Sequence, residues 1–234
     1  VCSSDLIYAD HAATTKISET AKLAMLSAME KDWYNPSSLY TPGQQASGTL
    51  MDARVRIAHC LGCLPKEIYF TSGGSEADNQ AILSAAAIGK RQGKMHIIST
   101  AFEHHAVLHT LKKLEKEGFE ITLLDVGEKG IVSPAQVEKA IRPDTALVTV
   151  MYANNEIGTI QPIREIGAVC RQNGVLFHTD AVQAAGHLPI NVKEDQIDML
   201  SLSAHKFNGP KGIGVLYAKT GVFVTNLIEG SGQE

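Results

Sequence analysis

The amino-acid sequence predicts an α/β domain of three layers (α/β/α), in which helices cover both faces of a mostly parallel sheet. Apolar runs of strand length alternate with segments of helical periodicity along most of the chain. Strands that alternate with helices pair in parallel through right-handed crossovers, and the crossover helices cover the sheet. The sequence also has no internal repeat and no low-complexity linker, so it predicts one large domain.

The predicted helices differ in the signals that support them. Residues 17–31 and 44–63 have amphipathic spacing, and 75–91 is rich in alanine. The segment 133–141 has a serine at its start and proline in its first turn, and 162–172 begins at a proline and ends before Asn173 and Gly174. A further helix is predicted from about residue 103 to residue 117.

The predicted strands are short apolar runs between these helices. They span residues 67–71, 95–99, 120–124, 146–151, 175–179, 197–202 and 214–218. The last strand follows its predecessor after little more than a turn, so it can run against its neighbours. The two helices before residue 67 form an N-terminal helical segment of the same domain.

Composition and charge exclude some classes of function. The chain has 234 residues, of which 44% are hydrophobic and 20% charged, as in ordinary globular proteins. A net charge of −4 gives no electrostatic reason to expect nucleic acid or an anionic membrane as a partner. No apolar run reaches the roughly 18 residues of a membrane helix. Residues 1–6 lack the features of a secretory signal, which favours a reduced, cytoplasmic setting. These six residues are predicted to be a non-native leader.

The four cysteines do not predict a metal site. Cys60 and Cys63 form a CxxC motif at the end of a predicted helix, whereas a redox CxxC opens a helix. A structural zinc site would need two more ligands at matching spacing. We therefore predict that Cys60 and Cys63 are small, buried, apolar side chains.

Lys206 is the first candidate for a catalytic residue. It follows the apolar strand 197–202 and precedes a turn rich in glycine and proline, which holds it in one place. Burial disfavours the ammonium form of lysine and frees a nucleophilic amine, which condenses with aldehydes to give a Schiff base. The alternative is a solvated loop lysine, which is the commoner case for an isolated lysine.

Other chemically capable residues follow the predicted strands. In open α/β sheets, ligands bind at the carboxyl ends of the strands. The glycine turn at 73–74 opens a helix, as phosphate sites do. Either His104 or His105 can lie flat against a planar ligand, or they simply start a helix. Asn155 can bind a ligand or belong to a polar turn. Asp180, with Gln183 after it, ends an apolar strand, where a carboxylate needs a cation, donors or a capping role.

Together these residues predict one pocket that holds a phosphate, a planar ring, a carboxylate and a Schiff-base lysine. Pyridoxal phosphate has these requirements. The cofactor withdraws electrons while its ring nitrogen stays protonated, and a carboxylate partner maintains that state. The combination is more specific than any of its parts.

Seven short motifs also resemble those of a known family. They are DHAATT at 10–15, NPSS at 35–38, FTSGGSEADN at 70–79, EHHAV at 103–107, NNEIG at 154–158, DAVQ at 180–183 and SAHK at 203–206. Their identity and order resemble cysteine desulfurases of the NifS/IscS type, which are pyridoxal phosphate enzymes related to the class V aminotransferases. The resemblance runs from about Ile7 to the last residue and implies the large domain of a fold type I pyridoxal phosphate enzyme, residues 7–234.

The resemblance implies a role for each matching position. Lys206 would form the Schiff base and move protons, Asp180 would hold the ring nitrogen protonated, and His104 would stack on the ring. The ring hydroxyl would be bound by Asn155 and Gln183. The phosphate would be held by Gly74, Ser75, Ser203 and His205. Position 75 is more often threonine in the family, and serine keeps the hydroxyl.

The family activity is conversion of L-cysteine to L-alanine, with sulfur transferred as a persulfide for iron–sulfur cluster assembly or tRNA thiolation. The resemblance thus implies a sulfur-acceptor or iron–sulfur scaffold protein as partner, and a homodimer. The family's nucleophilic cysteine and substrate-binding arginine lie well after the SAHK motif, and this chain reaches residue 234 before either. We therefore expect an N-terminal fragment that lacks the small C-terminal domain and is inactive alone.

Two other interpretations stay open at this point. One is another class V enzyme, such as a selenocysteine lyase or an aminotransferase of small substrates. The motifs at 103–105 and 155–158 favour a desulfurase over it. The other is a non-catalytic, pyridoxal phosphate-binding scaffold protein. Turnover of cysteine separates it from an enzyme, whereas retention of the cofactor does not.

Overall fold

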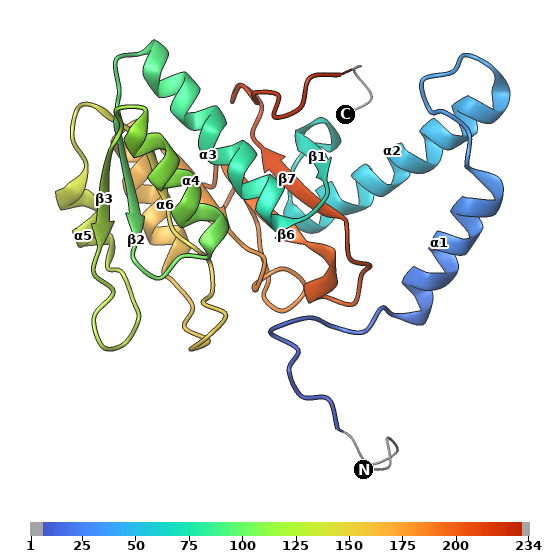
Figure 1. Ribbon diagram of the computed structural model, residues 1–234, viewed down its shortest axis with the longest axis horizontal. Helices are drawn as coiled ribbons and strands as arrows, with labels where there is room; N and C mark the ends of the chain where they lie inside the picture. The colour runs from blue at the N-terminus through green and yellow to red at the C-terminus, as the bar shows by residue number, and fades with distance from the viewer. Residues whose placement is uncertain (1–6, 231–234) are drawn as a thin grey trace.

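The computed structural model describes residues 7–230, which form a sheet between two layers of helices (Figure 1). The predicted leader, residues 1–6, lies outside the described residues. The α-helices are α1 (Glu19–Lys31), α2 (Thr41–Leu61), α3 (Gly74–Arg91), α4 (His105–Lys116), α5 (Pro134–Ala140) and α6 (Ile163–Gln172), and two short 3₁₀ helices are η2 (Pro65–Glu67) and η3 (Ala204–Lys206). Within residues 7–230, no helix is both long enough and apolar enough to cross a bilayer.

The sheet has seven strands in the order β1-β7-β6-β5-β4-β2-β3. They are β1 (Ile68–Thr71), β2 (His96–Thr100), β3 (Glu120–Leu124), β4 (Thr145–Thr149), β5 (Leu176–Asp180), β6 (Met199–Ser203) and β7 (Gly214–Ala218). β7 is antiparallel to both of its neighbours, and the remaining pairs are parallel. The predicted α/β class and mostly parallel sheet are confirmed, including the reversed last strand.

Small shifts of the strand ends matter for the site. β5 and β6 each continue one residue beyond the predicted end, so Asp180 and Ser203 are the last residues of their strands. β4 ends two residues earlier than predicted, at Thr149. Parallel strands bring their carboxyl ends to the same edge, so Thr149, Asp180 and Ser203 lie at one edge of the sheet.

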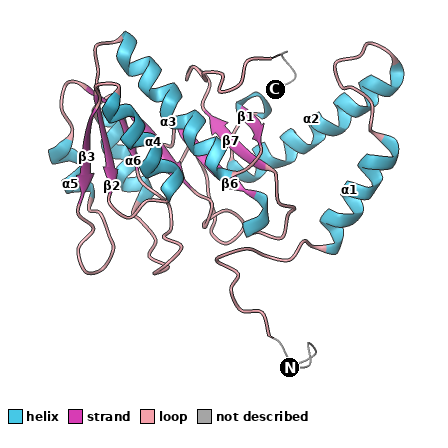
Figure 2. Ribbon diagram, viewed as in Figure 1, coloured by secondary structure: helices cyan, strands magenta, loops and turns pink. Residues whose placement is uncertain are grey.

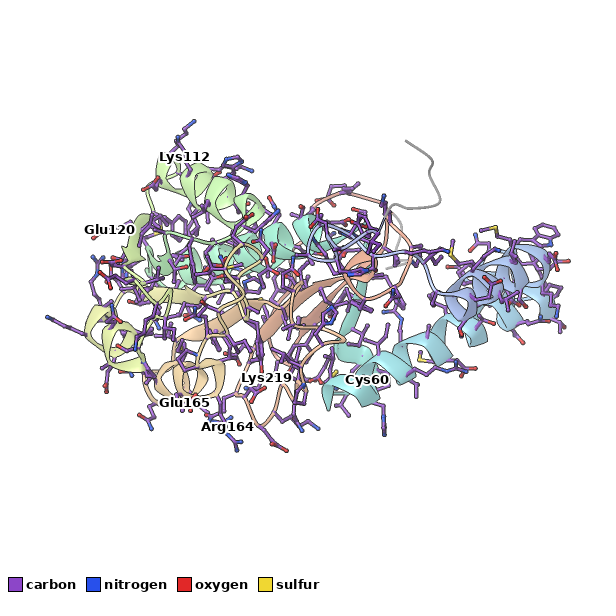
Figure 3. The ribbon with its side chains drawn as sticks, turned by 90° about the horizontal axis from the view of Figure 1, so that it is seen from below. Cys60, Lys112, Glu120, Arg164, Glu165 and Lys219 are labelled. Atoms are coloured by element: carbon purple, nitrogen blue, oxygen red, sulfur yellow. The ribbon has the colours of Figure 1, made fainter. Side chains whose placement is uncertain are left out.

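The two faces of the sheet are covered by different helices. α3 and α4 pack on one face, where Ile82, Leu111 and Met199 belong to one apolar cluster. α5 and α6 pack on the other, where Ile166 and Phe177 belong to a second cluster. In Figure 3, Lys112 of α4 and Arg164 and Glu165 of α6 point outward on opposite sides of the strands, as this layering requires.

The N-terminal helices stand away from this body. α1 and the first part of α2 extend to one side of the sheet (Figures 1 and 2). α1 has no buried residue, although its sequence is amphipathic. Large apolar side chains are exposed along α1, α2 and the connection between them: Leu23, Leu26, Met29, Trp33, Leu39, Tyr40, Met51 and Val55. This apolar surface needs a cover that the described chain does not supply.

The prediction that both cysteines of the CxxC motif are buried is wrong for Cys60. Cys60 is exposed on the last turn of α2 (Figure 3), and Cys63 is partly buried after the helix ends. Ala58 and Leu61 are the residues of this turn that face the core. Successive helical residues are about 100° apart, so Cys60 points away from the side that Leu61 buries. Burial raises the pKa of the Cys63 thiol to about 11.

Candidate active site

The nine residues predicted to contact a cofactor line one cavity of about 840 Å³ at the carboxyl ends of the strands. They come from segments far apart in the sequence, which the parallel sheet brings to one edge. They are Gly74, Ser75, His104, Asn155, Asp180, Gln183, Ser203, His205 and Lys206. The cavity also has lining residues that sequence reasoning did not assign, among them Asp10, Ala12 and Asp78.

One end of the cavity is built from the start of α3. Gly73, just before the helix, and Gly74, its first residue, allow the backbone to approach its neighbours closely. A Cβ on Gly74 would lie 2.6 Å from Cγ2 of Val182, and a Cβ on Gly214 would lie 2.7 Å from the backbone of Gly73. The turn therefore packs directly against β7 and beside Ser203. The first backbone N–H groups of this 18-residue helix have no partner within the helix. Together with the helix dipole, they favour an anion such as phosphate.

Lys206 lies in η3, directly after β6. Its Nζ donates hydrogen bonds to the carbonyl oxygens of Ala12, at 2.5 Å, and Ala13, at 2.9 Å. Burial lowers the pKa of the Lys206 amine, and the nearby carboxylates of Asp180 and Asp10 partly oppose that shift. A partly desolvated amine spends more time in the neutral, nucleophilic form.

The N-terminal segment 10–15 closes one side of the cavity, which sequence reasoning missed. The carbonyl oxygen of Ala12 also accepts a hydrogen bond from Nε2 of Gln183 at 2.9 Å. Thr15 donates its backbone N–H to the carbonyl oxygen of His205 at 2.8 Å, and Thr14 Oγ1 lies 3.0 Å from Nδ1 of His205. These partners are more than 160 residues apart in the chain, so local periodicity cannot predict their contacts.

Asp180 ends β5 and is 4% exposed. Its Oδ1 accepts a hydrogen bond from the backbone N–H of Val182 at 2.9 Å, as the capping interpretation required. Burial raises the pKa of Asp180, while the Val182 N–H, His104 and Lys206 favour its charged form. Asp180 is therefore both a local cap and a carboxyl group that lines the cavity beside two potential cations.

His104 starts a helix and also lines the cavity. It is the N-cap of α4, and its Nδ1 accepts a hydrogen bond from the backbone N–H of Ala106 at 3.1 Å. The neutral ring then carries its proton on Nε2. The same ring lines the cavity. Asn155 lines it as well, with its Nδ2 donating to Oε1 of Glu156 at 2.7 Å.

A buried polar layer lies under the cavity, between α3 and the sheet. Asp78 is 1% exposed, and its Oδ1 lies 3.7 Å from Nε2 of His178. Ser201, on the neighbouring strand β6, also contacts His178. The sequence carries one signal for this layer: an acidic residue one helical turn after Gly74, in an otherwise alanine-rich helix.

The cysteines of the described chain lie away from this cavity. None of Cys60, Cys63 and Cys170 lines it. Cys170 is fully buried in α6, and burial raises the pKa of its thiol well above the ordinary value. A reactive cysteine needs a lowered pKa and access. Cys170 has neither, and Cys63 has a raised pKa. Among residues 7–230, no group of three or more histidine, cysteine or acidic side chains is placed to hold a metal ion.

Comparisons with known proteins agree with this architecture. The family described as aminotransferase class-V matches residues 7–233. A protein named cysteine desulfurase IscS from Clostridium botulinum (strain Hall) is 52% identical over 228 residues, which is 97% of this chain and 57% of that protein. A putative cysteine desulfurase IscS 1 from Bacillus subtilis (strain 168) is also 52% identical, over 97% of this chain and 60% of its own length.

Solved structures give the same result. A structure described as "SspA in complex with cysteine" matches with a TM-score of 0.93 and 42% identity, over 97% of this chain and 66% of its own. A NifS-like protein matches with a TM-score of 0.93 and 38% identity, over 97% of this chain and 62% of its own. This chain therefore spans somewhat over half the length of the curated relatives that it matches.

Proposed function

The chain belongs to the class V aminotransferase family, is similar to its IscS- and NifS-type members, and from that premise we propose that it supplies the cofactor-binding large domain of a pyridoxal phosphate-dependent cysteine desulfurase. The reaction converts L-cysteine to L-alanine and passes the sulfur on as a persulfide. The observation that carries this proposal is one cavity in which Lys206, Asp180 and the start of α3 meet.

The residues present fit pyridoxal phosphate. The open N–H groups at Gly74 and Ser75, together with Ser203 and His205, offer donors to a phosphate. The Lys206 amine has the lowered pKa that condensation with an aldehyde requires. Asp180 supplies a buried carboxylate. These three features line one cavity and match the phosphate, the aldehyde and the ring nitrogen of the cofactor.

When bound, pyridoxal phosphate supplies an electron sink for negative charge at the α-carbon of the substrate. The Asp180 carboxylate would hold a proton at the ring nitrogen, and the His104 ring would face the cofactor ring. The side-chain amides of Asn155 and Gln183 would donate hydrogen bonds to the ring hydroxyl. The Lys206 amine would accept the proton from the α-carbon of L-cysteine.

Sulfur transfer requires a thiolate beside the substrate. The described cysteines line no part of the cavity, so we assign that thiolate to none of them. The similarity to the solved structure of SspA in complex with cysteine supports L-cysteine as the substrate here. By the same resemblance, a sulfur-acceptor or iron–sulfur scaffold protein in the reducing cytoplasm receives the persulfide sulfur.

We also propose a homodimer, with α1 and α2 as part of its interface. Leu26 and Met29 of α1 are 45% and 61% exposed, and Trp33 after the helix is 67% exposed. Contiguous exposed apolar surface of this kind marks association sites.

Sedimentation should show a dimer, and Leu26→Lys should shift it towards monomer. Leu123→Lys, at an exposed apolar residue of β3, is the matched control. A wild-type monomer at high concentration contradicts the proposal.

Alanine release from L-cysteine tests the enzymatic proposal. We expect little release from the 234-residue chain, because no described cysteine lines the cavity. A chimera that continues into the unmatched remainder of the Clostridium botulinum relative should release alanine, and Lys206→Ala should abolish it. A chimera that binds the cofactor but never turns over cysteine would favour the scaffold interpretation. A chimera that turns over selenocysteine alone would favour a lyase.

A further inference from the structure

We propose that Asp78 is a positioning residue held as the neutral acid, so that Asp180 is the carboxylate that carries negative charge in the layer under the cavity. This inference rests on the proposed cofactor, because the charge of Asp180 acts on the cofactor's ring nitrogen. Its first test, however, uses protein without cofactor.

The first step is the location of Asp78. It lies on α3 four residues after Gly74, so it faces the sheet on the same side of the helix as the glycine turn. It is 1% exposed and lines the bottom of the cavity. No hydrogen-bond partner for its Oδ1 is found within the described chain. A buried carboxylate that lacks donors is costly, whereas a buried carboxylic acid is much less so.

The second step is the state of the nearest basic group, His178. Its Nδ1 lies 2.8 Å from Oγ1 of Thr149, and its Nε2 lies 3.0 Å from Oγ of Ser201. Both ring nitrogens therefore have hydroxyl partners, which suits a neutral ring. Burial lowers the pKa of His178 to about 3, so it is not a cation at neutral pH. At 3.7 Å from Asp78 Oδ1, the neutral ring gives that carboxyl group no counter-charge.

The third step is the competition between Asp78 and Asp180 for ionisation. Asp180 follows His178 by two residues on β5 and pairs in register with Ser201, so all three side chains face α3. Burial raises the pKa of Asp78 well above its ordinary value, and the charges of Asp180 and Glu103 raise it further. A hydrogen bond from Ser201 is the opposing effect.

The surrounding charges favour Asp180 as the ionised member of this pair. Burial raises the pKa of Asp180 as well, but the Val182 N–H, His104 and Lys206 all favour its charged form. Asp78 has only the hydrogen bond from Ser201 to oppose its own shift. Glu103, at the end of the segment before α4, is itself buried, and burial raises its pKa to about 8. Glu103 therefore supplies no positive charge that would favour an ionised Asp78. Asp78 therefore keeps its proton and stands as a neutral acid beside the Ser201 and His178 pair.

The pH dependence of unfolding tests this assignment in the cofactor-free chain. The pKa of Asp78 is raised on folding, so its contribution to stability is complete below its unfolded pKa and is lost as the pH rises towards the folded pKa. Asp78→Asn cannot ionise. Its urea midpoint should therefore fall less than that of the wild type between about pH 5 and about pH 9. An equal or steeper fall would mean that Asp78 is ionised in the folded protein.

Glu67→Gln is the matched control, since Glu67 is also a buried carboxyl group. Burial alone would raise its pKa, but hydrogen bonds from Leu64 and Thr220 outweigh that effect and lower it. Glu67 is then ionised at both pH values of the experiment. The substitution should lower the urea midpoint at both and leave the difference between them unchanged. A control that changes this difference as Asp78→Asn does would remove the specificity of the result and overturn the proposal.

The second test uses protein loaded with pyridoxal phosphate and follows the pH titration of its visible absorption. Asp78→Asn should keep the wild-type midpoint, because the amide is neutral and fills the same space. Asp78→Ala should shift it, because Ser201 and His178 lose the polar group that faces them. A shift in Asp78→Asn as large as that in Asp78→Ala would show that the charge of Asp78 matters and would overturn the proposal. Wild-type protein that binds no cofactor would instead sink the proposed function, while the urea experiment would still decide the state of Asp78.

Discussion

The interface between α3 and the sheet has two halves of opposite character. Towards the carboxyl end of α3, Ile82 packs in a fully apolar cluster with Leu147 and Met199 of the strands. Towards the start of α3, Asp78 faces His178 of β5, which pairs with Ser201 of β6. Both halves are buried, and they use the same helix and strands. Burial stabilises the apolar half, whereas in the polar half it shifts pKa values and leaves Asp78 Oδ1 without a partner in the described chain.

The difference shows how one scaffold separates stability from chemistry. A helix that is firmly packed along one half holds its other end rigidly against the strand ends, where the cavity lies. Substitutions in the apolar half should therefore change the free energy of unfolding most. Substitutions in the polar half should change cofactor chemistry and pH dependence.

The largest expected effect is in the apolar half. Ile82→Ala should lower the free energy of unfolding by about 2–5 kcal/mol, because it leaves a cavity at a position with no exposed surface. Leu123→Ala, at a half-exposed position of β3, should change it by less than about 0.5 kcal/mol. Urea unfolding monitored by circular dichroism gives both values. Equal losses would contradict the assignment of stability to this half.

In the polar half, Asp180→Asn should reduce cysteine turnover in the chimera on the order of 10²-fold, or about 2.7 kcal/mol in activation free energy. The amide still forms hydrogen bonds, but it cannot hold a proton on the ring nitrogen. Cofactor retention, measured by dialysis and absorbance, should fall much less than turnover. Unchanged turnover would reduce Asp180 to a structural cap for Val182.

Gly74→Ala tests the close packing at the first residue of α3, where the polar half begins. The new methyl group would lie 2.6 Å from Cγ2 of Val182, and overpacking of this kind costs about 1–3 kcal/mol. The double variant Gly74→Ala with Val182→Ala should recover stability, because the clashing atom is then gone. Unfolding midpoints of the two variants decide this. A double variant no more stable than Gly74→Ala would show that the close approach to Val182 is not the cause.

The smallest effect is expected outside the interface. Cys60→Ser should change the free energy of unfolding by less than about 0.5 kcal/mol, because Cys60 is exposed. In the folded chain, a maleimide should label Cys60 and leave the fully buried Cys170 unlabelled. Mass spectrometry of the peptides distinguishes the two. Rapid labelling of Cys170 would mean that the core around α6 opens readily.

The sequence predicted the elements well because periodicity is a local property. Each predicted strand and helix is present, with ends that differ by a few residues. Lys206, Asp180 and the other residues that follow strands could be named because parallel strands bring their ends to one edge. Ser75, Ser203 and His205 were named from the resemblance of the motifs to the family. The segment 10–15 and the pairing of Asp78 with His178 could not be predicted. Both depend on how distant segments pack, and no local pattern records that.

Two single features show the same limit. The burial of Cys60 was predicted wrongly, because helical periodicity gives the apolar side of α2 but not the angle at which its last turn meets the core. The sequence predicted α1 as a helix with an apolar side. It did not show that this side would remain exposed in the described chain.

Lys206, in the cavity that Asp78 also lines, is the proposed point of covalent attachment of pyridoxal phosphate. Borohydride reduction of the loaded protein, followed by peptide mass spectrometry, tests it most directly. Lys206→Ala should abolish the trapped adduct, and Lys211→Ala, at another lysine that lines the cavity, should retain it. Equal labelling of the two variants, or an adduct at Lys211 in the wild type, would contradict the account.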